Sequence, residues 1–308
     1  MEGVNVAMTT VVALLNLGFA VLVGAVLTDW QLQSQTAAWA RRRRAPLRAI
    51  RLCASLWLGL MLVTVLALEA ATMAEVPLAE IGPSLGPILT DTHFGHVWLG
   101  SIGIVAILLA LQWVRQISTP VGLFCAVALI TFAVTRSLVS HAVVAGNLSW
   151  PVAVETLHLL LISVWLGEVV LSGLYMLRQP SGMQVQDRNA CRRYIDGLST
   201  TATIALAGIV ATGLINTWRG LGSPSHLLDN PWSLILIAKL ALVATAAGLG
   251  AFNRWVVMPS LLSGLKVGVN TDQPQKRFVR VLQVEVVVLG IVLIAAALLS
   301  ASSPPTAM

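Results

Sequence analysis

The chain of 308 residues is 57% hydrophobic and only 10% charged, and its mean hydropathy is +0.84. Soluble domains carry about a quarter charged residues, so this composition excludes an ordinary water-soluble globular protein. The net charge of +6 does not indicate nucleic-acid binding, because the basic residues lie between apolar runs and form no single basic face. We therefore expect the lipid bilayer, and no nucleic acid, as the surroundings of this chain.

Long apolar runs, separated by charged or Pro- and Gly-rich breaks, predict membrane-spanning helices. A helix needs about 20 apolar residues to span a bilayer, and a helix satisfies its own backbone polar groups in lipid. The first run follows Glu2 with no basic residue ahead and no cleavage pattern after it, so we interpret it as a retained span. We expect an all-α bundle that forms a single transmembrane domain, 1-308. Its eight spans are predicted at about 5-28, 48-73, 96-115, 120-141, 152-177, 195-218, 231-256 and 279-301.

The distribution of charge predicts the orientation of the bundle. All but three of the 19 lysines and arginines fall on one side of it, the exceptions being Arg136, Arg219 and Lys239. By the positive-inside rule this side is the cytoplasm, which places both termini outside. The run Arg41 to Arg44 is then a topogenic signal, with binding of anionic lipid headgroups as the lesser alternative. All three cysteines fall toward the inner side, which fits a bacterial plasma membrane with a reducing interior.

The sequence lacks the motifs of nucleotide-driven machines. It contains neither a Walker-type glycine loop nor a long cytosolic insertion. This excludes most ATP-driven pumps, and we expect a protein that is not an enzyme.

All five histidines fall on the expected outer side. His93 and His96 open the third span, His141 closes the fourth, and His158 lies about two turns inside the fifth. Imidazole is the commonest protein ligand for copper and zinc, so the grouping indicates a metal site near the outer surface. His93 and His96 share a helical face if the third helix starts early enough, and the alternative is a pair of interfacial side chains.

His158 lies within a span, where a polar ring needs a partner. Glu155, Ile162 and Trp165 stand at positions i−3, i+4 and i+7 from it, so the four residues form one stripe that we expect to face the bundle interior. In the alternative interpretation, His158 bonds to Glu155 and serves packing alone.

Further ionisable groups lie inside predicted spans, namely Glu69, Glu168, Lys239 and Glu285. Each costs about 2.5 to 3.5 kcal/mol on insertion unless it is paired or wetted, so they should face one another or a cavity. Lys239 paired with a carboxylate could be structural, or it could belong to a cation pathway. Met73, near Glu69, offers a thioether that suits Cu(I), although isolated methionines usually fill space.

Several short motifs occur in a fixed order along the chain. They are Thr92-His93-Phe94-Gly95-His96-Val97-Trp98, Ser140-His141-Ala142, Leu157-His158-Leu159-Leu160, Val164-Trp165-Leu166-Gly167, Ala211-Thr212-Gly213-Leu214-Ile215-Asn216, Ala238-Lys239-Leu240, Asn253-Arg254 and Glu285. On an eight-span frame this order resembles the CopD family of copper-resistance and copper-transport membrane proteins, which includes PcoD and the membrane part of YcnJ.

The resemblance implies a copper ion as the ligand, a periplasmic copper-binding partner of CopC type and a multi-pass location in the bacterial inner membrane. It matches His141 and His158 to the histidine-bearing motifs of the family, and Lys239, Asn253 and Glu285 to its polar positions within spans. The chain departs from the family at Glu168, where a second glycine is common. It also departs at His93 and His96, whose positions are variable or basic in the family.

We therefore expect outer copper to bind mainly His141 and His158, helped by some of His93, His96, Glu155 and Met73. The ion would move inward along intramembrane carboxylates without ATP, since a negative-inside potential favours entry by about 2.3 kcal/mol per charge per 100 mV. One alternative is a haem b redox protein with His141 and His158 as axial ligands. Another is a copper-binding assembly factor that transports nothing.

Overall fold

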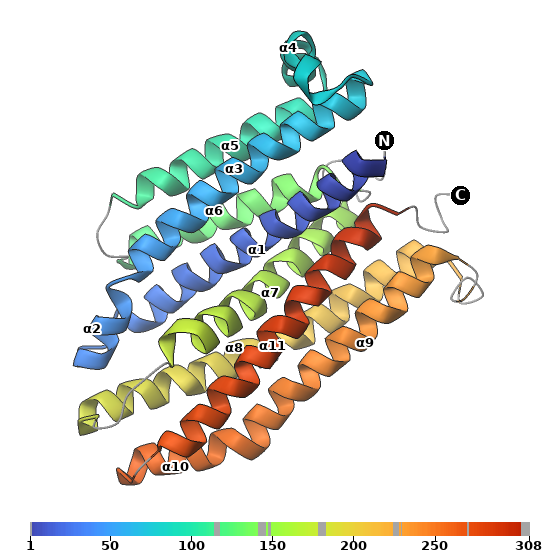
Figure 1. Cartoon of the computed structure of the whole chain (residues 1–308). Helices are drawn as coiled ribbons and strands as arrows, with labels where there is room; N and C mark the ends of the chain where they lie inside the picture. Colours follow the sequence, from blue (N-terminus) through green and yellow to red (C-terminus); the bar gives the residue numbers. More distant parts are fainter. Residues whose placement is uncertain are drawn as a thin grey trace.

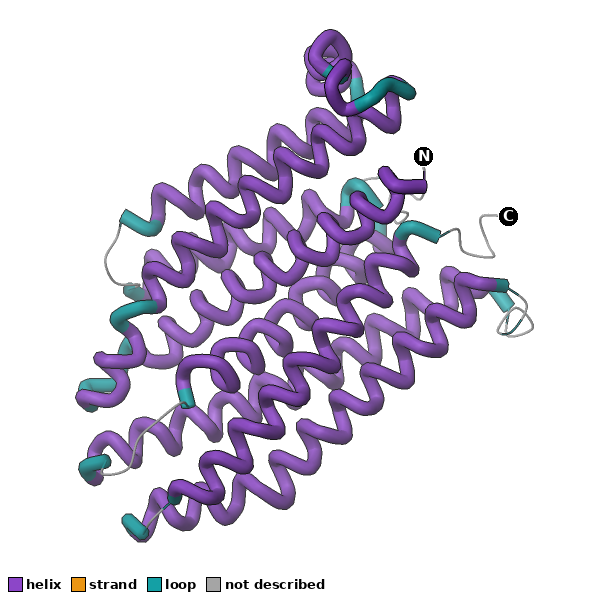
Figure 2. The backbone as a smooth tube through the Cα atoms, in the orientation of Figure 1, coloured by secondary structure: helices purple, strands orange, loops and turns teal. Residues whose placement is uncertain are grey.

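The computed structural model describes residues 2–113, 118–140, 146, 149–177, 183–223, 228, 230–269 and 271–302. Within these residues the chain is helical and forms no strand (Figure 2). Eight helical segments are long and apolar enough to cross a membrane: Val6–Leu32, Ala38–Ala74, His93–Leu111, Thr119–Ser137, Trp150–Met176, Val185–Leu221, Pro231–Val267 and Asp272–Ser300. The predicted all-α bundle with eight spans is confirmed.

Several of these segments consist of more than one helix. The α-helices are α1 (Glu2–Leu32), α2 (Ala38–Arg44), α3 (Leu47–Ala74), α4 (Gly82–Asp91), α5 (His93–Leu111), α6 (Thr119–Ser137), α7 (Trp150–Leu171), α8 (Val185–Leu221), α9 (Pro231–Phe252), α10 (Met258–Val267) and α11 (Asp272–Ser300). The π-helical turn η3 (Ser172–Met176) ends α7, and a second one, η5 (Asn253–Val257), links α9 to α10. The 3-10 turn η1 (Leu78–Glu80) precedes α4.

Helix α1 lies between the two flanks of the bundle (Figure 1). It packs against α3 on one side and α7 on the other, while α7 packs on α8 and α11 packs on α9. The start of α1 and the end of α11 lie at the same end of the bundle, which we call the terminal face. The opposite end carries α2 and α10, and we call it the arginine face.

Helix α1 and helix α7 approach each other very closely at two glycines. A Cβ atom on Gly167 would overlap the carbonyl oxygen of Ala20, and one on Gly24 would overlap the backbone of Gly167. This contact fixes which side of α7 faces α1. The stripe that carries His158 is thereby directed away from α1, toward α8, α9 and α11.

Four helical segments extend well beyond the predicted spans at the arginine face, including the second, which begins at Ala38, and α11, which begins at Asp272. Helix α8 begins at Val185 and not near residue 195, and the α9 segment continues to Val267. The extra first turns of α8 are polar, and tertiary contacts hold them: the Asp187 carboxylate accepts a hydrogen bond from the Trp39 backbone N–H at 2.7 Å and pairs with Arg42 at 3.2 Å. Hydropathy detects the apolar part of a helix only, so it missed these extensions.

The run of arginines in α2 has partners inside the protein. Arg43 donates to the Tyr175 carbonyl oxygen at 3.2 Å, and Arg44 pairs with the buried carboxylate of Asp29. Arg51, itself buried, pairs with Asp29 as well and donates from Nε to Gln112 Oε1 at 2.9 Å. Besides their predicted role in orientation, these arginines tie α2 to α1 and η3, and α3 to α1.

Candidate functional site

The predicted polar stripe on α7 exists, and each polar member bonds to a neighbouring helix. Asn216 of α8 donates from Nδ2 to Glu155 Oε2 at 2.9 Å, and His158 Nδ1 lies 2.7 Å from Thr212 Oγ1 of α8. Trp165 donates from Nε1 to Glu285 Oε1 of α11 at 2.9 Å. The stripe therefore faces the space bounded by α8 and α11.

The hydrogen bonds around Thr212 orient the His158 ring and favour one of its tautomers. Thr212 Oγ1 donates its only proton to the Gly208 carbonyl oxygen at 2.6 Å, one turn back on the same helix. With the hydroxyl proton on Gly208 O, the hydroxyl oxygen accepts the bond from the imidazole and the ring proton is on Nδ1. Nε2 is left with a free lone pair, the form in which histidine binds metals.

Lys239 of α9 lies at the same level as His158. Both residues are about 12 Å along the helix axis from the terminal-face ends of their helices, Trp150 and Pro231. The Lys239 ammonium interacts electrostatically with the Glu155 carboxylate and the His158 ring. All three side chains are half-buried. This level of the bundle therefore holds one carboxylate, one ammonium and one neutral imidazole.

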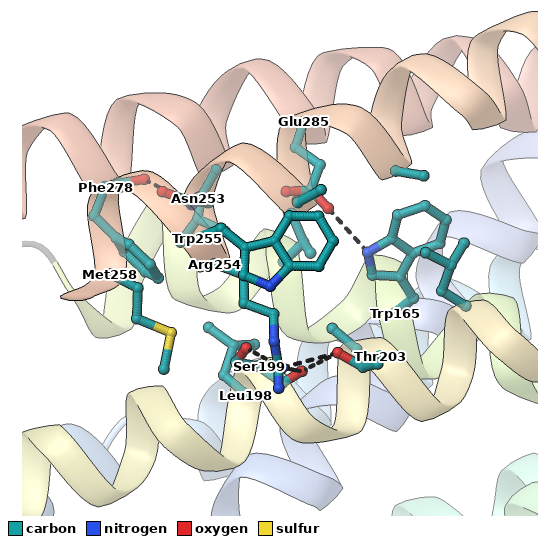
Figure 3. Close-up of a pocket in the computed structure, with 17 residues that line it drawn as sticks. Trp165, Leu198, Ser199, Thr203, Asn253, Arg254, Trp255, Met258, Phe278 and Glu285 are labelled. Atoms are coloured by element: carbon teal, nitrogen blue, oxygen red, sulfur yellow. Dashed lines mark hydrogen bonds between the residues drawn. The ribbon is translucent and has the colours of Figure 1, made fainter. Parts of the chain in front are cut away.

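A pocket of about 170 Å³ lies farther toward the arginine face, between α8 on one side and α9 with η5 on the other (Figure 3). Trp165 and Glu285 belong to its wall, as does Asn253, which donates from Nδ2 to the Phe278 carbonyl oxygen at 3.3 Å. Arg254 reaches from η5 across to α8. Its NH1 group donates to Ser199 O at 2.9 Å, Ser199 Oγ at 2.6 Å and Thr203 Oγ1 at 2.9 Å.

Glu168 lies on a different side of α7. Its carboxylate is fully buried, accepts a hydrogen bond from Gln31 Nε2 of α1 at 2.7 Å and accepts another from Thr201 of α8. These contacts join three helices near the arginine face. Glu168 is thus separated from the stripe that carries His158 and Trp165.

The other predicted ligands lie on helices α3 and α5. Helix α5 begins at His93, early enough for His93 and His96 to share one helical face. Both histidines are nevertheless exposed, and His93 Nε2 lies 3.1 Å from the Leu138 carbonyl oxygen. Met73 is exposed and Glu69 is half-buried, both on α3. His141 lies outside the described residues. Within the described part of the chain no three His, Cys, Asp or Glu side chains gather closely enough to hold a metal ion.

Sequence reasoning missed the α8 side of the site. Thr212 and Asn216 are four residues apart inside an apolar run, and they bond to His158 and Glu155, which are three residues apart on α7. A polar pair at helical spacing within a span was the available signal.

Comparison with known proteins places the chain in one family. The profile of the N-terminal domain of copper resistance protein D-like proteins matches residues 3–150, and that of copper resistance protein D matches residues 190–299. Copper resistance protein D of Pseudomonas syringae pv. tomato is 26% identical over 221 residues, which cover 68% of this chain and 69% of that protein. Inner membrane protein YebZ of Escherichia coli K12 is 23% identical over 255 residues, which cover 82% and 83%.

No solved structure matches the chain. The two matched segments contain α8, α9 and α11, whereas most of α7 lies between them. Together with the eight apolar helices, these matches show that the chain belongs to the copper resistance protein D family and is a multi-pass helical membrane protein.

Proposed function

We propose that this protein carries copper inward across the bacterial inner membrane, without ATP, and that His158 Nε2 is a first ligand to the ion. The observation that supports this most directly is the hydrogen bond between Nδ1 and Thr212, because it orients the ring and leaves Nε2 without a protein partner in the described part of the chain. Imidazole nitrogen suits both oxidation states of copper.

The carboxylate of Glu155 supplies the negative charge at the level of His158 and Lys239 in the bundle. Asn216 holds one of its oxygens, and the Lys239 ammonium interacts with it electrostatically. A copper ion that binds His158 and Glu155 thus competes with Lys239 for the same carboxylate. His141, which precedes α7 in the chain, stays our predicted second imidazole.

A route from this level toward the arginine face follows the polar residues of three helices. Lys239 and Gly250 occupy one face of α9, Asn253 follows at the start of η5, and Gly250 lies beside the Glu285 carboxylate of α11. We take the terminal face as periplasmic, so that a copper-binding protein of CopC type would deliver the ion there. The membrane potential then favours inward movement of the cation.

The test is copper uptake into vesicles that contain the purified protein, with wild type and His158→Ala compared side by side. We expect His158→Ala to abolish uptake while its gel-filtration profile and helix content stay unchanged. Uptake equal to wild type would reject the site. Stoichiometric binding without flux in wild type would favour the assembly-factor alternative, and a Soret band in the purified protein would favour the haem alternative.

A further inference from the structure

The pocket between α8 and η5 opens at the side of the bundle. Helices α8 and α9 make few direct contacts with each other, while α7 and α11 contribute Trp165 and Glu285 to the pocket wall. At the rim, Arg254 is exposed and Trp255 has 75% of its surface exposed. In a chain that spans the membrane, such an opening faces lipid, and the pocket is accessible to membrane-soluble molecules.

The pocket wall presents hydrogen-bond acceptors that lack donors. Glu285 is only 2% exposed, and Trp165 bonds to its Oε1, but no described residue donates to Oε2. Asn253 is 3% exposed and donates to a carbonyl oxygen, which fixes the orientation of its amide, and Oδ1 has no partner in the described part of the chain. Asn253 Oδ1 is a buried polar atom without a partner among the described residues, which destabilises the empty pocket. The pocket is therefore suited to a ligand that donates hydrogen bonds.

The π-helical turn η5 is a second, independent indication that the pocket is a ligand-binding site. It starts at Asn253 and interrupts the regular hydrogen bonding of the α9 segment at the level of the pocket. Such turns are rare and occur frequently at functional sites. An apolar pocket with a few convergent polar groups is also the usual form of a small-molecule site.

We propose that this pocket binds the head group of a membrane-soluble hydroquinone. A cavity of ~150 Å³ accommodates a six-membered aromatic ring, so the space is sufficient. Trp165 and Phe278 offer aromatic surfaces, and the two hydroxyl groups supply the donors that Glu285 and Asn253 lack. The tail of the ligand leaves between α8 and α9 into lipid. This proposal does not rest on copper transport, although Asn253 and Glu285 also belong to the proposed copper route.

A phospholipid fits the same observations less well. An acyl chain has no donor for the two acceptors, and the Arg254 NH1 group is already held by Ser199 and Thr203. The expected ligand is therefore distinguished by its hydroxyl protons and not by its apolar part.

The experiment measures binding of tritiated decyl-hydroquinone to the purified protein in nanodiscs under anaerobic conditions. Ala202→Phe places a ring in the pocket, whereas Ala207→Phe places the same ring on the exposed side of α8, away from the pocket. Glu285→Gln keeps an oxygen for Trp165 but removes the carboxylate. The dimethyl ether of the ligand has the same ring and no hydroxyl protons.

We expect saturable binding of one hydroquinone per chain to wild type and to Ala207→Phe, and none to Ala202→Phe. Glu285→Gln should weaken binding about tenfold, and so should the change from hydroquinone to dimethyl ether. Three outcomes would each overturn the proposal: no saturable binding to wild type, equal binding to Ala202→Phe, or equal affinity for the ether. Competition by an anionic phospholipid but not by unlabelled hydroquinone would also overturn it, in favour of a lipid site. Copper uptake by wild type and His158→Ala, neither of which alters the pocket, tests the transport proposal separately.

Discussion

His158 on α7 and Thr212 on α8 form a hydrogen bond of 2.7 Å between Nδ1 and Oγ1, at the same depth in two neighbouring helices. Because the Thr212 proton is used in the bond to Gly208, the threonine acts as an acceptor and determines which ring nitrogen can bind a metal. A threonine on one helix thus controls the chemistry of a histidine on another.

The first prediction concerns this bond. Thr212→Val keeps the shape of the side chain and removes the acceptor, so the His158 ring loses its fixed tautomer and orientation. Loss of such supporting partners typically weakens metal affinity about 10 to 100-fold, and we expect copper affinity to fall by at least the lower figure in competition with a chromogenic Cu(I) chelator. Thr212→Ser should restore it.

A matched control for this variant is Thr245→Val. Thr245 lies on α9, is exposed and makes the same type of bond to the carbonyl oxygen four residues earlier, at 2.9 Å from Ala241 O. Equal copper affinities for Thr212→Val and Thr245→Val would show that Thr212 has no role in binding.

The second prediction concerns the charge of Lys239. Its ammonium interacts with Glu155 and His158, so it opposes a copper ion at this level. Lys239→Met removes the charge but keeps most of the apolar stem, and we expect copper to bind about tenfold more tightly, or about 1.4 kcal/mol. Lys266→Met, on the exposed surface of α10, should leave the affinity unchanged. Weaker binding by Lys239→Met would mean that Lys239 supports the site.

Composition and apolar runs were sufficient to predict the number of spans, because lipid imposes a length and an apolar character that one sequence displays directly. The polar start of α8 was not predictable in this way. Asp187 stabilises it through Trp39 and Arg42, which lie far away in the sequence. Helix α4 was also missed, since Pro83, Pro87 and its glycines are weak helix formers.

Of the candidate site, the half on α7 was predictable from the sequence and the half on α8 was not. The spacing of Glu155, His158 and Trp165 on one face of α7 follows from helix periodicity alone. Which face of α8 meets that stripe depends on how the two helices pack, and an apolar α8 surface carries little information about it. The pair Thr212 and Asn216 is visible in the sequence, but its partners on α7 were identified only when the helices were placed side by side.

The third prediction separates Glu168 from the copper route. Its buried carboxylate accepts hydrogen bonds from Gln31 and Thr201, away from His158. Glu168→Ala takes the acceptor from the Gln31 amide, whereas Thr201 keeps its bond to the Gly197 carbonyl oxygen at 3.1 Å. We expect a loss of about 1 to 3 kcal/mol in stability, seen as a lower midpoint of thermal unfolding in detergent. Copper affinity at temperatures where the variant is folded should match wild type. A large loss of affinity in that folded sample would place Glu168 in the metal pathway.

The fourth prediction concerns the contact that fixes the rotation of α7. A methyl group on Gly167 would overlap the Ala20 carbonyl oxygen, and backbone atoms cannot yield as a flexible side chain can. Gly167→Ala must therefore separate α1 from α7, which lowers the unfolding midpoint and displaces the stripe that carries His158, so copper uptake should fall with stability. Gly103→Ala, on α5, has no atom within 4 Å of the added methyl group and should be neutral or slightly stabilising through its higher helix propensity. If Gly167→Ala unfolds at the wild-type temperature, α1 and α7 do not pack at this distance, and the orientation of His158 toward α8 has to be explained by other contacts.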